Sequence, residues 1–219
     1  MSKKVKTYEL YECSIDYIKS LLNSEYPWQI LPKIKEHIIS LVQGGAKGFT
    51  KLKDGVYVGA NVKISPFATI EGLAIIGDNC EIRPGAYIRG NVITGSNCVI
   101  GNSSELKNCI LLNNVQVPHY NYVGDSILGN FSHMGAGAIC SNLKADKKMV
   151  VIHGETELDT GLRKVGAFLG DGADVGCGCV LNPGTIIGKN TCVYPLSVVR
   201  GVVPSNSIFK SKDNVVPKL

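Results

Sequence analysis

Large aliphatic residues recur at every sixth position along much of the chain. One such series runs from Val58 to Leu112 and is aliphatic at nine of its ten positions. The position four residues after each is mostly small, as at Ala68 and Ala74. Gly, Asn and Asp fall between them, where tight turns use backbone conformations that these residues adopt readily. A period of six is not helical; it predicts a short strand followed by a turn, repeated many times.

The phase of this repeat changes twice. It slips near Pro118, breaks over residues 142–168, and returns from Leu169 to Val199. Strands this short cannot bury a core alone, so successive coils must stack on one another. Nineteen hexads at three per coil predict about six coils. The sequence therefore predicts an all-β solenoid with the large residue pointing inward and the small residue filling each corner.

The chain divides into segments where the repeat starts and stops. Residues 1–50 lack it and carry two short amphipathic helical patterns, which predict a helical cap over the first coil. Residues 51–205 are expected to form the solenoid, with the inserted loop at 142–168, and residues 206–219 a C-terminal tail. The insert reads as a β-hairpin that turns near Gly154.

Composition narrows the class of protein. The chain has 219 residues and a net charge of +5, with no basic stripe of the kind that binds nucleic acid. No apolar stretch reaches the roughly 20 residues that span a bilayer, and the basic N-terminal residues are not followed by the apolar region of a signal peptide. We therefore expect a cytoplasmic protein. The eight cysteines are expected to be reduced thiols. Cys80, Cys98 and Cys179 occupy the small-residue slot, where a thiol acts as apolar packing.

The hexapeptide pattern resembles the left-handed parallel β-helix of acyltransferases. From Ile82 to Asn142 it resembles the acetyltransferase half of the bacterial bifunctional N-acetylglucosamine-1-phosphate uridyltransferase/glucosamine-1-phosphate acetyltransferase. The hairpin insert ending in RKVGAFLGD is similar to that of archaeal members. The resemblance covers roughly residues 58–205. The nucleotidyltransferase domain is absent, so no uridyltransferase activity is expected.

The resemblance implies residues for the acceptor sugar. Arg83 in RPGA and Lys107 in NSSELKN match residues that hold the sugar phosphate. In PHYNYVGD, His119 matches the catalytic base and Tyr122 a sugar-binding tyrosine. His133 stands where bacterial members have a sugar-binding asparagine. Arg83 and Lys107 are expected to face one groove, and His119 to leave the packed wall at a phase slip.

The resemblance also implies a site for acetyl-CoA as co-substrate. Asn142 matches an asparagine close to the thioester, and Ala136 matches a backbone contact. Cys177 replaces a serine near the cofactor, and Pro195 replaces a small residue there. The basic pair Lys147 and Lys148 offers charges for the phosphates of coenzyme A.

Three functions remain open at this stage. The first is an acetyl-CoA-dependent N-acetyltransferase acting on an amino-sugar phosphate, assembled as a homotrimer, with no metal in the site. The chemistry needs a base for the amine and donors for the thioester oxygen, and histidine titrates near neutrality. The second is a non-catalytic trimeric scaffold or sugar-nucleotide-sensing module. The third is a carbonic anhydrase, which needs three histidine ligands from His119, His133 and His153.

Overall fold

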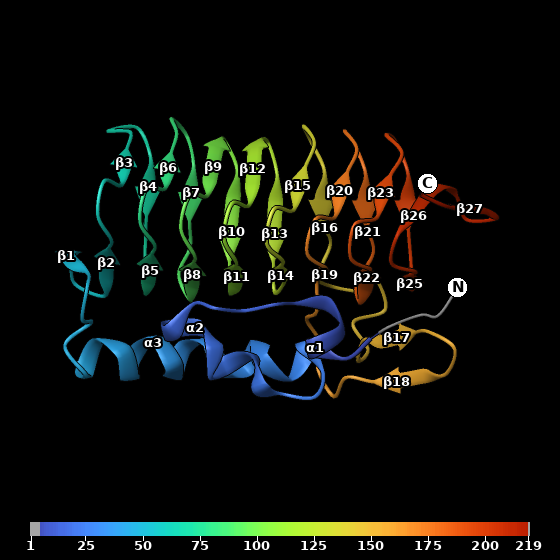
Figure 1. The fold of residues 1–219 in the computed structure, drawn as a ribbon, viewed down its shortest axis with the longest axis horizontal. Helices are drawn as coiled ribbons and strands as arrows, with labels where there is room; N and C mark the ends of the chain where they lie inside the picture. Colours follow the sequence, from blue (N-terminus) through green and yellow to red (C-terminus); the bar gives the residue numbers. More distant parts are fainter. Residues whose placement is uncertain (1–4, 219) are drawn as a thin grey trace.

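The computed structural model describes residues 5–218. From residue 50 onward the chain winds into a three-sided prism of mainly parallel strands (Figure 1). We name the three faces sheets A, B and C. Sheet A has nine strands, in the order β1 (Thr50–Lys53), β2 (Val56–Val58), β5 (Ala74–Ile76), β8 (Val92–Thr94), β11 (Cys109–Leu111), β14 (Ile127–Leu128), β19 (Ala167–Leu169), β22 (Thr185–Ile187) and β25 (Val202–Val203).

Sheets B and C complete the prism. Sheet B contains β3 (Lys63–Ile64), β6 (Glu81–Ile82), β9 (Val99–Asn102), β12 (Gln116–His119), β15 (His133–Met134), β20 (Asp174–Val175), β23 (Cys192–Val193), β26 (Ser207–Ser211) and β27 (Asn214–Pro217). Sheet C contains β4 (Thr69–Ile70), β7 (Tyr87–Ile88), β10 (Glu105–Lys107), β13 (Tyr122–Gly124), β16 (Ile139–Cys140), β21 (Val180–Leu181) and β24 (Val198–Val199). The expected left-handed parallel β-helix is confirmed.

The ends of the solenoid are closed by antiparallel strands. β1 pairs antiparallel with β2 at the first coil, and β27 pairs antiparallel with β26 at the last. The remaining strands give eight parallel rungs in sheets A and B and seven in sheet C, so the expectation of about six coils was too low. The segment 206–219 is no separate tail, because β26 and β27 continue sheet B.

Every change in coil length lies at the edge between sheets C and A. Paired residues are 18 apart in the early coils, as in Ile75 and Ile93, and 17 apart in the next, as in Ile93 and Ile110. The step from sheet B to sheet C stays constant throughout: Tyr87 follows Glu81 by six residues, as the start of β13 follows the start of β12. The first phase slip therefore lies between β10 and β11, and not near Pro118.

The N-terminal helices cover a face of the prism and not its end. They are α1 (Thr7–Leu10), α2 (Asp16–Lys19), η1 (Leu21–Asn23), η2 (Pro27–Lys33) and α3 (Ile34–Gln43). Figure 1 shows them running along sheet A. Their buried side chains, such as Ile18 and Ile34, form one cluster with outward-facing residues of sheet A, such as Ile93 and Phe168. The predicted cap over the first coil is wrong in position, because sheet A is apolar on both surfaces and must be covered along its length.

Two tyrosines fix this cover to the sheet. Tyr11 donates its hydroxyl to the carbonyl of Ile127 at 3.2 Å, and Tyr17 donates to the carbonyl of Thr94 at 2.9 Å. No helix in the described part of the chain is long and apolar enough to cross a membrane.

The predicted hairpin is present as β17 (Val151–His153) paired antiparallel with β18 (Glu157–Asp159). It extends the cover of sheet A, because Val150 and Ile152 are fully buried in the same cluster as the N-terminal helices. The three cysteines expected as packing are fully buried within the structure.

Candidate functional site

Four of the predicted residues stack along the edge between sheets B and C. They occupy the same turn position in successive coils: His119, Ala136, Cys177 and Pro195. The N–H of Gly137 donates to the carbonyl of His119 at 3.0 Å, and the same pattern links the next two coils at 2.8 Å each. Coils lie about 4.8 Å apart, and all four residues are exposed. The structure thus gathers the expected base and three expected cofactor contacts into one column.

This column offers free backbone donors. The N–H groups of Ala136 and Cys177 make no hydrogen bond to any described residue. Each is flanked by two glycines, which add no side chain of their own beside the N–H. An exposed N–H next to uncovered backbone can donate to a ligand carbonyl or to a thioester oxygen that gains negative charge.

The backbone at His119 is held firmly while its ring is exposed. Its N–H donates to Oδ1 of Asn121 at 3.1 Å, and the buried Asn121 donates from Nδ2 to the carbonyls of Gly135 and Ala138. His119 pairs in register with Asn102 of β9. The B–C edge therefore has regular geometry at His119. The phase slip that was expected here lies instead at the C–A edge, where the coil length changes.

A second cluster lies at the edge between sheets C and A. The Asp125 side chain is 5% exposed and accepts hydrogen bonds from Lys107 Nζ at 3.0 and 3.1 Å. It also accepts from the side-chain amides of Asn108 at 2.9 Å and Asn142 at 2.5 Å. Asn142 further donates to the Tyr122 hydroxyl at 3.2 Å. The structure thus links three predicted site residues: Lys107 and Asn142 bind Asp125 directly, and Tyr122 is joined through Asn142.

Sequence reasoning missed Asp125. Its signal was its place at the end of PHYNYVGD, as the one acidic residue within the buried run 123–129. The cluster also changes the chemistry of Tyr122, since burial and then the charges of Glu105 and Asp125 raise the pKa of its phenol. Tyr122 therefore stays protonated and can donate a hydrogen bond at neutral pH.

Arg83 and Lys107 are not brought together by a shared partner. Arg83 pairs with Glu81 through Nε at 3.1 Å and Nη2 at 3.2 Å, on the outer surface of sheet B. Lys107 belongs to sheet C and pairs with Asp125. Both lie on outward surfaces of adjacent faces, and the expected common groove stays a prediction.

The remaining predicted residues lie apart from both clusters. His133 Nδ1 lies 2.8 Å from Asp174 Oδ1 on sheet B. That pair lines a cavity of about 470 Å³ with Asn114, Gln116, Phe131 and Ser132. Lys147 and Lys148 are exposed in the insert loop.

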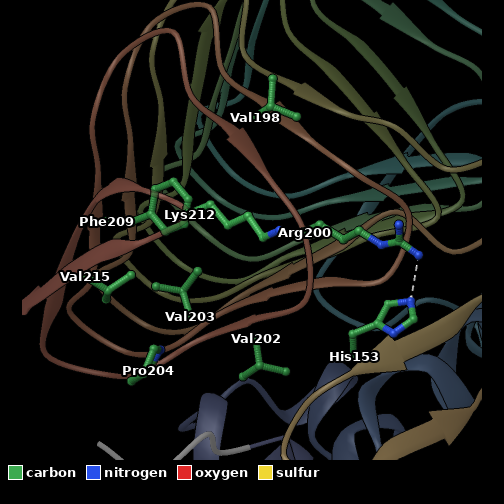
Figure 2. Close-up of a pocket in the computed structure, with 9 residues that line it drawn as sticks. All are labelled: His153, Val198, Arg200, Val202, Val203, Pro204, Phe209, Lys212 and Val215. Atoms are coloured by element: carbon green, nitrogen blue, oxygen red, sulfur yellow. Dashed lines mark hydrogen bonds between the residues drawn. The ribbon is translucent and has the colours of Figure 1, made fainter.

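The three histidines considered as metal ligands occupy different places. His119 is on the B–C edge, His133 pairs with Asp174 on sheet B, and His153 Nε2 accepts from Arg200 at 2.8 Å in the hairpin (Figure 2). Within residues 5–218, no three metal-binding side chains come together.

Comparison with known proteins confirms the resemblance. Residues 70–161 match a family model described as the GMPPB C-terminal domain. The bifunctional protein GlmU of Methanococcus maripaludis is 33% identical over 194 residues, which cover 87% of this chain and 47% of that protein. A bifunctional sugar-1-phosphate nucleotidylyltransferase/acetyltransferase of Sulfurisphaera tokodaii is 35% identical over 112 residues, 51% of this chain and 28% of that protein.

The chain spans about a quarter to a half of the length of these bifunctional relatives. The uncharacterized acetyltransferase YaiX of Escherichia coli is 34% identical over 153 residues, 69% of this chain and 66% of that protein. Among solved structures, AntD, an N-acyltransferase from Bacillus cereus, is 18% identical with a TM-score of 0.46, covering 78% of this chain and 91% of that one.

Proposed function

We propose that this chain, a homologue of the C-terminal part of GlmU-type bifunctional proteins, is an acetyl-CoA-dependent N-acetyltransferase acting on an amino-sugar phosphate. The observation that supports this most directly is the column on the B–C edge. It places an exposed histidine next to two stacked turns whose Ala136 and Cys177 N–H groups have no partner among the described residues.

The proposed reaction uses the column as follows. The amine nitrogen of the sugar attacks the thioester carbonyl, and His119 takes the proton that the nitrogen loses. An N–H of the column donates to the thioester oxygen as it becomes negative. The carbon–sulfur bond then breaks, and the leaving thiolate takes a proton to become free coenzyme A. No metal has a role in this scheme.

The cluster around Asp125 at the C–A edge, which includes Lys107, Tyr122 and Asn142, supplies the rest of the proposed site from a second subunit. Within one chain, His119 and Asn142 lie on opposite edges of sheet C. We place the B–C edge of one subunit against the C–A edge of the next in a trimer of parallel prisms, an arrangement in which the two residues would meet. Sheet A is already covered by the N-terminal helices, so sheets B and C are the faces left for this contact.

A thiol-release assay tests this function. The full chain is supplied with acetyl-CoA and a panel of hexosamine 1-phosphates, and free thiol is measured over time. Turnover that requires both the amino sugar and acetyl-CoA supports the proposal. Sedimentation at micromolar concentration gives the oligomeric state. A trimer without turnover on any amino-sugar phosphate would instead favour a non-catalytic trimeric scaffold.

A further inference from the structure

A pocket of about 590 Å³ lies where the insert hairpin meets the last coil of the solenoid (Figure 2). Three nitrogen-bearing side chains enter it from three elements: His153 from β17, Arg200 after β24, and Lys212 from the turn between β26 and β27. The rest of its lining is apolar: Val198, Val202, Val203, Pro204, Phe209 and Val215. Of the described residues that line it, none is acidic.

Arg200 is held in place by a neutral partner. A guanidinium only donates, so its Nη2 donates to His153 Nε2 at 2.8 Å. The other ring nitrogen, Nδ1, then carries the proton and donates to Glu157 Oε1 at 3.0 Å. Among the described residues this is the only hydrogen bond of the Arg200 side chain. Most of its N–H groups are therefore available, and no carboxylate touches its charge.

The hairpin that carries His153 is docked closely on this coil. Gly201 has a φ of +82°, and a Cβ there would lie 2.6 Å from the carbonyl oxygen of His153. Only glycine permits this approach at this backbone conformation. The docking sets the His153 ring against Arg200, so the cation is positioned before any ligand arrives.

Lys212 provides a second charge on the same pocket. Figure 2 shows its side chain extended toward Arg200, whose guanidinium group is directed toward His153. Within residues 5–218 neither Arg200 nor Lys212 forms an ion pair. Two cations next to an apolar wall gain stability when an anionic group lies between them and an apolar group covers the wall.

We propose that this pocket binds an amphiphilic anion, a molecule with one phosphate or carboxylate on a short apolar body. The anionic group is bound by Arg200 and Lys212, and the apolar body packs on Phe209 and Val215. The pocket lies at the end of the His119 column, because Lys212 follows the residue that is level with Pro195 in the next coil. The proposal does not depend on the proposed function.

Calorimetric titration of the full chain tests this proposal with four probes: hexyl phosphate, hexanoate, inorganic phosphate and hexanol. We expect one saturable site per chain, with an anionic hexyl probe binding more tightly than either phosphate or hexanol alone. The tighter of hexyl phosphate and hexanoate identifies the anionic group. Replacing a charged donor should weaken binding about tenfold or more, so Arg200→Gln and Lys212→Gln should each raise the Kd.

Lys210→Gln is the matched control. Lys210 lies on the same strand end, its Nζ is 5.8 Å from the centre of the Tyr194 ring, and it does not line the pocket. The Lys210→Gln substitution removes the same charge outside the pocket. The Kd of this variant for the hexyl anions should therefore stay close to that of the parent chain. Melting temperatures check that each variant is folded. Absence of saturable binding by both hexyl anions, or equal loss in Lys210→Gln and Arg200→Gln, would overturn the proposal.

Discussion

Lys107 Nζ lies 3.0 Å from Oδ1 of Asp125, whose side chain is only 5% exposed. Asp125 also binds the amides of Asn108 and Asn142, so one carboxylate joins three consecutive coils at the C–A edge. The ion pair is the only one in the described chain with such a deeply buried carboxylate. It holds Asn142 in position and places Lys107 at the same edge.

The first prediction concerns that carboxylate. Asp125 has a φ of +48°, which asparagine tolerates, so Asp125→Asn removes the charge without straining the backbone. Lys107 loses its charged partner, and one of the two accepting oxygens becomes an NH2 group that faces another donor. We therefore expect the free energy of unfolding to fall by about 3 kcal/mol. Urea denaturation measures this change.

The control for that experiment is an exposed ion pair. Arg89 Nη1 lies 2.6 Å from Glu105 Oε1, and both side chains are partly exposed. Arg89→Gln should change the free energy of unfolding by less than about 1 kcal/mol. An equal effect of the two substitutions would show that burial at Asp125 does not matter.

The second prediction concerns His119. Loss of a general base typically lowers a rate by about 10²- to 10⁴-fold, so His119→Ala should reduce kcat at least about 10²-fold. Its ring makes no hydrogen bond to any described residue, so the melting temperature should stay nearly unchanged. Asn102→Ala, one coil away on the same edge, is the comparison variant. Full turnover by His119→Ala would exclude the proposed role.

The third prediction is a loss of stability at high pH. Burial raises the pKa of Tyr11 well above its ordinary value, and that of Tyr17 as well. Both therefore bind their proton more tightly when folded. Their contribution is fully present below about pH 10, where the unfolded phenols are still protonated, and is lost as pH rises further. The expected slope is about 1.4 kcal/mol per pH unit for each tyrosine.

Trp28 reports this change directly. It is the only tryptophan, 3% exposed, and stacks on Tyr26 within the N-terminal cover. Its fluorescence should follow urea unfolding at pH 9 and pH 11. Tyr17→Phe should reduce the difference between the two pH values, since phenylalanine does not titrate. An unchanged difference in that variant would refute the assignment to Tyr17.

The fourth prediction uses a column of left-handed turn residues between sheets A and B. The position is asparagine in most coils, as at Asn97 and Asn114, but Phe131 occupies it with φ +59°. Phe131 is 68% exposed, so it gains little from burial. Phe131→Asn should stabilise the chain by about 1 kcal/mol. The reverse change, Asn114→Phe, should lower the melting temperature; a lower melting temperature for Phe131→Asn would contradict the argument.

The sequence by itself determined the solenoid. A large aliphatic residue every six positions, with Asn and Gly at the turns, has few other packed solutions, because each short strand needs neighbouring coils to bury it. The segment where this pattern breaks was predicted to be a hairpin with its turn near Gly154, and the hairpin is present as β17 and β18. The small-residue position predicted the burial of Cys80 and Cys98. The resemblance then identified His119, Ala136 and Cys177, which the regular coil spacing stacks on one edge.

Tertiary structure alone decided the rest. A period of six assigns the inward residues, but it does not show that Ile93 and Phe168, on the other surface of sheet A, are also buried under the N-terminal helices. The period also does not show at which edge the coils become shorter. A coil that is one residue shorter shifts the phase of all later hexads, whichever edge has lost the residue. The contacts of Asp125 and Arg200 join residues that are 17 to 47 positions apart in the sequence. Only the stacking of coils and the docking of the hairpin bring such residues into contact.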